Sequence, residues 1–207
     1  QLVNWEDASF GTVQSCLVCH APLSEQSARL LSNDEWLANP AYDEDLRNHG
    51  IVCASCHVRG NRRHGPPRRD GSVEPSPEGS PHGGVIRTEF FEDSRFCAGC
   101  HQFGPGGAAP NGKPLENTHA EWAQSRYARE GRTCQSCHMR PAVSAGADKN
   151  DAAVRNDLPT HDQVGGNYWF ADITRYQDGK GALRLGGGLT TEQTTAMELA
   201  QQRAMEH

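Results

Sequence analysis

Short stretches with helical spacing alternate with segments rich in glycine, proline and charged residues. The pattern predicts helices over about 27–38, 117–130 and 191–206, with Thr118 and Glu121 as a candidate capping box for the second. The apolar positions of the last predicted helix continue to the end of the sequence, a pattern that is typical of a fragment of a longer protein. Residues 61–84 and 104–110 are dense in glycine and proline, and both predict loops. No apolar run of about 18 residues occurs, so we expect no membrane span.

All eight cysteines fall into four copies of Cys-x-x-Cys-His. This spacing is the attachment signature of c-type haem, in which two sulfurs form thioethers and the next histidine binds the iron. Two intervening residues place both sulfurs on one side of a helical turn and present the imidazole to the centre of the same ring. We therefore predict four covalently attached haem c groups. The motifs are Cys16, Cys19 and His20; Cys53, Cys56 and His57; Cys97, Cys100 and His101; and Cys134, Cys137 and His138.

Two other uses of eight cysteines leave part of the pattern unexplained. A disulfide framework is plausible for an exported chain, but it gives no reason for a histidine after every second cysteine. Two zinc sites with four cysteine ligands each would leave the same four histidines without a role.

The composition is poor for an ordinary hydrophobic core. Only 35% of the residues are hydrophobic and 7% aromatic, with 22 glycines and 12 prolines. Haem groups would supply the missing apolar surface, so we expect folding to be coupled to haem attachment and the apoprotein to be largely unfolded.

Charge and the first residue indicate the partners and the compartment. The net charge of −6 argues against nucleic acid as a partner. Five arginines crowd into residues 59–69, where we favour neutralisation of haem propionates or a solvated loop over a docking patch for an acidic partner. The chain begins at Gln1 rather than methionine, which predicts removal of a signal peptide and a periplasmic or extracellular location.

Motif spacing predicts the domain organisation. The motifs begin at positions 16, 53, 97 and 134, so the spacings are 37, 44 and 37. We expect a first dihaem module over 1–60, a connecting loop over 61–89, a second dihaem module over 90–141, and a haem-free segment over 142–207 that supplies a distal ligand and subunit contacts. Duplication is supported by the matched Gly-x-x-Cys-x-Ser-Cys-His-x-Arg of the second and fourth motifs, and by Glu35-Trp36 against Glu121-Trp122.

Each iron also needs a distal ligand or an open position, and six histidines lie outside the motifs. We favour His49, His82, His119 and His161, which lie near a motif or near glycines that would let a macrocycle approach the backbone. His64 lies in the arginine-rich loop and His207 at the terminus, and either can serve instead. Methionine ligation by Met139, Met197 or Met205 is the less favoured alternative.

Three segments carry a resemblance to a known family: Phe96 to Phe103, Glu121 through Tyr127 to Met139, and His161 to Asn167. They resemble the multihaem c-type cytochromes of bacteria, a group that includes the tetrahaem shuttle of ammonia oxidisers and the tetrahaem subunits of extracellular cytochrome filaments. The resemblance implies a mainly α fold with much irregular coil and no extensive sheet, wrapped around four stacked haems with bis-histidine irons. The distal histidines are not equivalent in the two modules, so the pairing of ligand and haem stays open.

Electron transfer is the leading functional hypothesis. The chain would be a soluble carrier between redox partner proteins, or the subunit of a conductive filament in which haem chains join end to end. The alternative is a multihaem oxidoreductase with one open haem that acts on a small nitrogen or sulfur compound; gas sensing would need the same open site.

Overall fold

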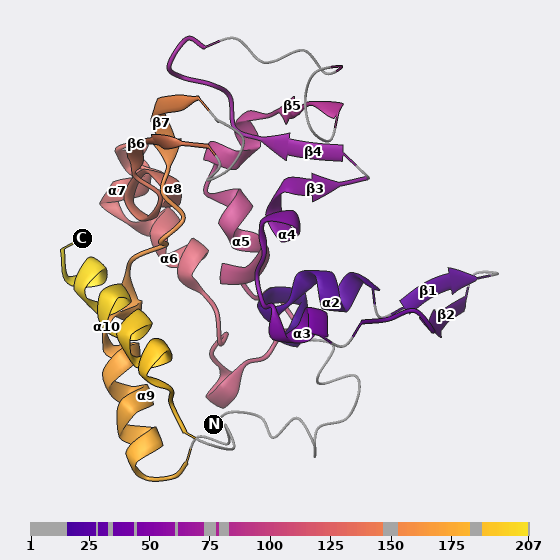
Figure 1. Ribbon diagram of the computed structural model, residues 1–207, viewed down its shortest axis with the longest axis vertical. Coiled ribbons are helices and arrows are strands. Elements are labelled where there is room, and N and C mark those ends of the chain that lie inside the picture. Colours follow the sequence, from indigo (N-terminus) through magenta and orange to yellow (C-terminus); the bar gives the residue numbers. More distant parts are fainter. Residues whose placement is uncertain are drawn as a thin grey trace. The chain divides into compact units, whose positions relative to one another are not determined.

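The computed structural model describes residues 16–27, 29–32, 35–43, 45–60, 62–72, 78, 83–146, 153–182 and 188–206. The chain divides into two compact units, residues 1–129 and 130–207, and each is described by itself. The described residues form short helices, coil and a few short strands without a large sheet, as expected for a mainly α chain with much coil (Figure 1). The expected dihaem modules are defined by haem contacts and stay a prediction.

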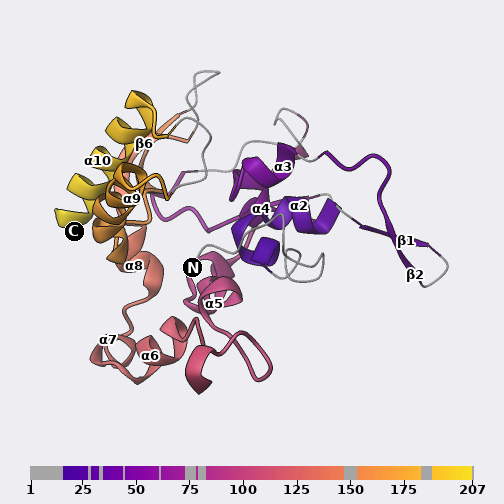
Figure 2. The ribbon, with the colours of Figure 1, turned by 90° about the horizontal axis from the view of Figure 1, so that it is seen from below.

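The first unit begins with three short helices and a hairpin. Residues 16–20 are helical, and α2 (Pro22–Ser27) and α3 (Asp45–Asn48) follow. The helix predicted over 27–38 is wrong, because β1 (Arg29–Ser32) and β2 (Glu35–Ala38) form an antiparallel hairpin there. The Asn-Asp pair that separates the two strands in the sequence is typical of tight turns, and this signal outweighs the helical spacing. Figure 2 shows the hairpin extending from α2.

A small three-stranded sheet follows the second motif. Helix α4 (Cys53–His57) leads into β3 (Val58–Arg59), which pairs antiparallel with β4 (Arg62–Gly65), and β4 pairs parallel with β5 (Ile86–Arg87). Residues 62–65 are therefore a strand, where the sequence predicted only loop. Gly60 lies in the turn at φ +55°, a conformation that glycine adopts without steric cost.

The rest of the first unit is helical with a coil insertion. It comprises η3 (Glu89–Glu92), α5 (Arg95–His101), η4 (Pro110–Gly112), α6 (Thr118–Gln124) and α7 (Arg126–Arg129). Residues 104–109 form turns and coil, as predicted.

The predicted helix over 117–130 is two helices. Ser125 is extended, and its hydroxyl accepts a hydrogen bond from the Tyr127 amide (3.2 Å) at the start of α7. The predicted capping box is also wrong. Asn117 is the N-cap and Thr118 is already helical, so the Thr118 hydroxyl lies too far along the helix to cap it.

The second unit combines a hairpin with two longer helices. Helix α8 (Cys134–His138) precedes the antiparallel strands β6 (Pro141–Ala145) and β7 (Val154–Pro159). After η5 (Gly166–Trp169), the helices α9 (Phe170–Gly179) and α10 (Thr191–Met205) lie side by side (Figure 1). The helix predicted over 191–206 is confirmed as α10, which begins with a capping box between Thr190 and Gln193.

Few apolar side chains are buried. In the described part of the chain the buried hydrophobic residues are Leu17, Ala21 and Ala171. Large apolar side chains stay exposed beside the motifs, among them Val18, Ile51 and Val58. Protein interiors of this size normally bury many such residues, so the described residues do not build an ordinary core of their own.

Candidate functional site

All four Cys-x-x-Cys-His motifs adopt the same local structure. Residues 16–20, α4, the last part of α5 and α8 are each a short helical segment that ends at the motif histidine. The predicted helical turn is therefore confirmed in every copy. No disulfide joins any of the eight cysteines, and each is half-buried except the exposed Cys53.

The second and fourth motifs also share their entry. Gly50 and Gly131, each three residues before the first cysteine, have φ +63° and +71°. The residue before each cysteine, Val52 or Thr133, is then extended and forms the N-cap. Duplication is thus supported by backbone conformation next to the motifs. It does not extend to the Glu-Trp pairs, because residues 35–36 lie in β2 and residues 121–122 in α6.

The serine inside each of these two motifs binds the start of its own helix. Ser55 Oγ accepts from the Val52 amide (3.3 Å), and Ser136 Oγ donates to the Thr133 carbonyl (2.7 Å). The contact of Ser55 satisfies a backbone N–H that the start of a helix leaves without an intrahelical partner, and the contact of Ser136 adds a second bond to the N-cap carbonyl. The serine is therefore part of how a five-residue helix holds its shape.

Two motif histidines are oriented by backbone carbonyls. His57 Nδ1 lies 2.8 Å from the His64 carbonyl oxygen, and His138 Nδ1 is hydrogen-bonded to the Val164 carbonyl oxygen. A carbonyl only accepts, so Nδ1 carries the proton and Nε2 carries the lone pair. That tautomer is the one in which Nε2 binds a metal.

Gly165 makes room for the His138 ring. A Cβ at Gly165 would lie 3.0 Å from His138 Cε1 and 3.2 Å from Nδ1, closer than ordinary packing allows. The sequence analysis linked this glycine to a macrocycle, whereas in the structure its missing side chain accommodates the motif imidazole. The Val164 carbonyl could not be predicted from the sequence, because any residue type supplies a carbonyl.

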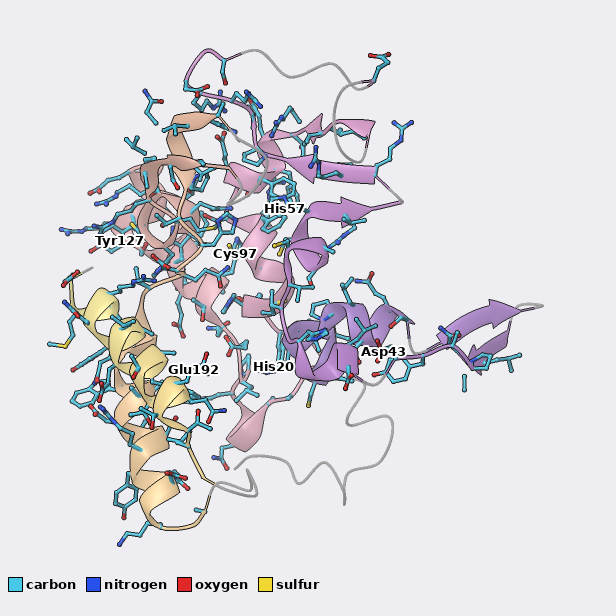
Figure 3. The ribbon with its side chains drawn as sticks, viewed as in Figure 1. His20, Asp43, His57, Cys97, Tyr127 and Glu192 are labelled. Carbon is cyan, nitrogen blue, oxygen red and sulfur yellow. The ribbon has the colours of Figure 1, made fainter. Side chains whose placement is uncertain are left out.

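Aromatic rings connect the second motif to the third. His57 stacks on Phe91 with ring centroids 4.9 Å apart and an interplanar angle of 15°. Phe91 in turn contacts Phe96 at 4.7 Å, and Phe96 precedes the first cysteine of the third motif. Figure 3 labels His57, at one end of this contact chain, and Cys97, the residue that follows Phe96.

The first and third motifs meet through their sulfurs. Burial raises the pKa of the Cys19 thiol to about 11, with a further rise from a hydrogen bond to the Cys100 thiol. The two sulfurs are therefore within hydrogen-bonding range of each other. Burial also raises the pKa of Cys56. The sequence predicted that neighbouring motifs pair, and it did not predict a contact between the first and third motifs.

Gln102 joins the third motif to the helix that carries His119. Its side-chain amide donates to Asn117 Oδ1 (3.1 Å) and its carbonyl oxygen accepts from the Ala120 amide (2.8 Å). Next to it, His101 Nδ1 lies 3.7 Å from a Glu116 carboxylate oxygen. Neither Gln102 nor Glu116 was predicted as a site residue, although Gln102 directly follows the third motif.

His119 has a buried ring nitrogen. Its Nε2 atom is inaccessible to water and has no hydrogen-bond partner among the described residues, and the ring contacts Trp122 at 5.3 Å. A buried imidazole nitrogen normally finds a donor or acceptor. An orphaned lone pair of this kind fits a distal haem ligand.

The remaining candidate ligands are spread over the chain. His49 is exposed in the turn after α3, His64 is half-buried in β4, and His161 is exposed in coil. His82 and His207 lie outside the described residues. Met139 follows α8, and the other two methionines belong to α10.

Arginines of the 59–69 cluster bind groups of this chain, and two of them bridge residues that are distant in the sequence. Arg69 pairs with the Glu92 carboxylate and lies 3.5 Å from Glu89, and these contacts raise its pKa. Arg63 donates to the Gly84 carbonyl at 3.3 Å. They hold the long connection between β4 and η3, a role that the sequence analysis did not weigh.

A hollow lies beside the fourth motif, entirely within the second unit. Its volume is about 200 Å³, and its lining includes Cys137, Arg140 and Arg203. Arg203, on α10, forms an ion pair of 2.7 Å with Asp162. The lining also includes the carboxylates of Asp162 and Glu206, so the hollow combines a sulfur that fits a thioether with side chains of both charge signs.

None of the protein-family models, curated proteins and solved structures compared with the chain matches it. In the described ranges no helix is long and apolar enough to cross a membrane, in line with the expected absence of a span. Those ranges also contain no group of three or more His, Cys, Asp or Glu side chains close enough to hold a bare metal ion.

Proposed function

We propose that this protein is a tetrahaem c-type cytochrome that transfers electrons. The observation that carries the proposal is the shared geometry of the motifs. All four Cys-x-x-Cys-His sequences end a helical turn, and in two of them a backbone carbonyl orients the imidazole. The cysteines would form the thioethers and the four motif histidines would be the proximal ligands.

The carbonyl contacts have a chemical purpose in this role. A haem supplies a reversible one-electron change at iron. His57 and His138 hold the Nδ1 proton, keep the Nε2 lone pair directed away from the carbonyl, and gain basicity from the hydrogen bond. A haem held in this way would have its potential set by its ligands, by its burial and by nearby charge.

Distal histidines would complete the coordination and leave no room for a substrate. His119 has the best support because its buried Nε2 lacks a partner in the described part of the chain. His49, His82 and His161 complete the proposed set of four. With a histidine on both faces, all irons would be low-spin, which suits electron transfer rather than substrate activation.

The partners and the location follow from the same proposal. We favour an exported protein, periplasmic or extracellular, that exchanges electrons with redox proteins as a soluble carrier or that joins copies of itself in a filament. A multihaem oxidoreductase remains the alternative function, and it requires one iron with an open distal position.

The test combines cofactor content with spin state. The purified protein should carry four haems by intact mass and by the pyridine haemochrome assay, and the Cys134→Ala/Cys137→Ala variant should carry three. The reduced protein should bind no carbon monoxide. Fewer than four covalent haems would refute the tetrahaem assignment, whereas four haems with one that binds carbon monoxide would favour the oxidoreductase.

A further inference from the structure

We propose that His161 coordinates the iron of a haem other than the one attached at Cys134 and Cys137. The inference rests on the proposed function, because it concerns which iron a proposed distal ligand serves. By sequence position alone His161 would be assigned to the fourth haem, since it is the first histidine after the fourth motif.

The first step places Val164 on the proximal side of the fourth haem. Its carbonyl oxygen accepts a hydrogen bond from His138 Nδ1. Gly165 lies against the same ring, because a Cβ added at this glycine would be 3.0 Å from His138 Cε1. When Nε2 binds the iron, Nδ1 is on the far edge of the imidazole. Val164 and Gly165 therefore lie beneath the proximal imidazole, and the distal face is on the other side of the macrocycle.

The backbone between His161 and Val164 is too short for His161 to reach the distal face of the fourth haem. His161 is three residues before Val164, and three residues span at most about 10 Å when fully extended. To reach the distal face, the backbone would have to run from beneath the proximal imidazole, pass outside the rim of the porphyrin and continue above its plane. A porphyrin with its side groups is too wide for a span of this length. His161 and the proximal His138 are thus on the same side of the fourth haem.

The second motif gives an internal comparison. The His64 carbonyl accepts from His57 Nδ1 at 2.8 Å, so the residue that orients the second proximal imidazole is itself a histidine. The same reasoning excludes His64 as the distal ligand of the second iron. In both places a histidine that is close to a motif in space belongs to its proximal side.

His161 is suited to serve an iron elsewhere. It is exposed, in coil, and followed by Asp162, whose carboxylate is fixed to Arg203 on α10 at 2.7 Å. The segment is therefore held at both ends, at Asp162 by α10 and at Val164 by His138. The iron that His161 binds belongs either to another haem of the same chain or to a haem of a second copy.

The experiment compares His161→Ala in two backgrounds. In the four-haem protein, the variant should convert one haem in four to high spin, measured by the ferric high-spin electron paramagnetic resonance signal and by carbon monoxide binding. In the three-haem Cys134→Ala/Cys137→Ala background, His161→Ala should still create one high-spin haem. If His161 served the fourth iron, the added substitution would have no effect there. A fully low-spin His161→Ala protein would show that His161 binds no iron and would also overturn the inference.

If the three-haem protein does not fold, a structure of the four-haem His161→Ala protein shows which iron has lost its distal ligand. That iron should not be the one bound by His138. Loss of the distal ligand at the fourth iron would overturn the inference. Dilution of the unsubstituted protein distinguishes the two sources of iron. If a high-spin signal appears on dilution, the iron bound by His161 belongs to a second copy of the chain. If the spectrum stays constant, the iron belongs to the same chain. A protein that carries four haems but in which His161 binds the fourth iron, or no iron, would reject this inference and leave the proposed function unaffected.

Discussion

The ring of His57 lies between a backbone carbonyl and an aromatic face: Nδ1 is 2.8 Å from the His64 oxygen, and the ring stacks on Phe91 at 4.9 Å. The hydrogen bond fixes the tautomer, and the stacking restricts rotation of the ring. Together they orient the imidazole before any ligand binds, which lowers the entropic cost of metal coordination.

Phe91→Ala should destabilise the first unit by about 1–3 kcal/mol, because two ring contacts are lost from a half-buried position. Phe90→Ala is the matched control. Phe90 is an exposed neighbour whose ring meets only the edge of Phe96 at 5.6 Å, so its removal should cost clearly less. Thermal unfolding of both holoproteins measures the difference. Equal losses would show that stacking on His57 contributes nothing.

His119→Ala should turn one low-spin haem into a high-spin, carbon monoxide-binding haem, since the buried Nε2 atom is assigned to a distal position. His64→Ala serves as the control for removal of a half-buried imidazole, because His64 is not in the proposed distal set and the substitution keeps the carbonyl that binds His57 Nδ1. Visible absorption and electron paramagnetic resonance report the change. A His119→Ala protein that keeps four low-spin haems would remove His119 from the ligand set.

Local features of this chain could be predicted from sequence, and contacts between distant segments could not. Cys-x-x-Cys-His specifies its own helical turn, and α10 starts at a threonine that its own sequence marks as a cap. The 29–38 hairpin was missed because four-residue strands show too few alternations to outweigh an apparent helical spacing.

The candidate site follows the same division. The proposed attachment residues are read directly from the motif, whereas the groups that orient the motif histidines are a backbone carbonyl at Val164 and a ring at Phe91. Neither has a sequence signature, because every residue has a carbonyl and aromatic rings serve many purposes. The approach of Cys19 to Cys100 depends on tertiary structure across some 80 residues of chain.

Acid should weaken the start of α5. Asp93 accepts from the Arg95 amide (2.8 Å) and its guanidinium, and these contacts lower the pKa of Asp93 to about 2. A lowered carboxyl pKa stabilises the fold above the unfolded-state value near 4, and this contribution disappears as the pH falls towards 2. Stability should therefore fall more between pH 4 and 2 in the unsubstituted protein than in Asp93→Asn, which keeps the oxygen acceptor. Parallel denaturation curves for the two proteins would contradict the assignment.

The first and third haems should be the closest pair among the first three. The Cys19 and Cys100 thiols are within hydrogen-bonding range, and each would become the thioether sulfur at the rim of a haem. The first motif also approaches the second, but there the near groups are Gly50 and the His20 carbonyl, which belong to the backbone. Iron–iron distances from a structure of the holoprotein decide the matter. A shorter distance between the first and second irons would reject the expected order.

Gly131→Ala should destabilise the approach to the fourth motif by about 1 kcal/mol, because residue 131 has φ +71° and a Cβ there is strained whatever space surrounds it. Gly99→Ala is the matched control. Gly99 lies inside the third motif with an ordinary helical backbone and nothing within 4 Å of an added Cβ, so alanine should be neutral or stabilising. Both variants should keep four haems, and chemical denaturation then compares the two glycines directly. An equal response at both positions would mean that the left-handed backbone at Gly131 is not needed for the turn into α8.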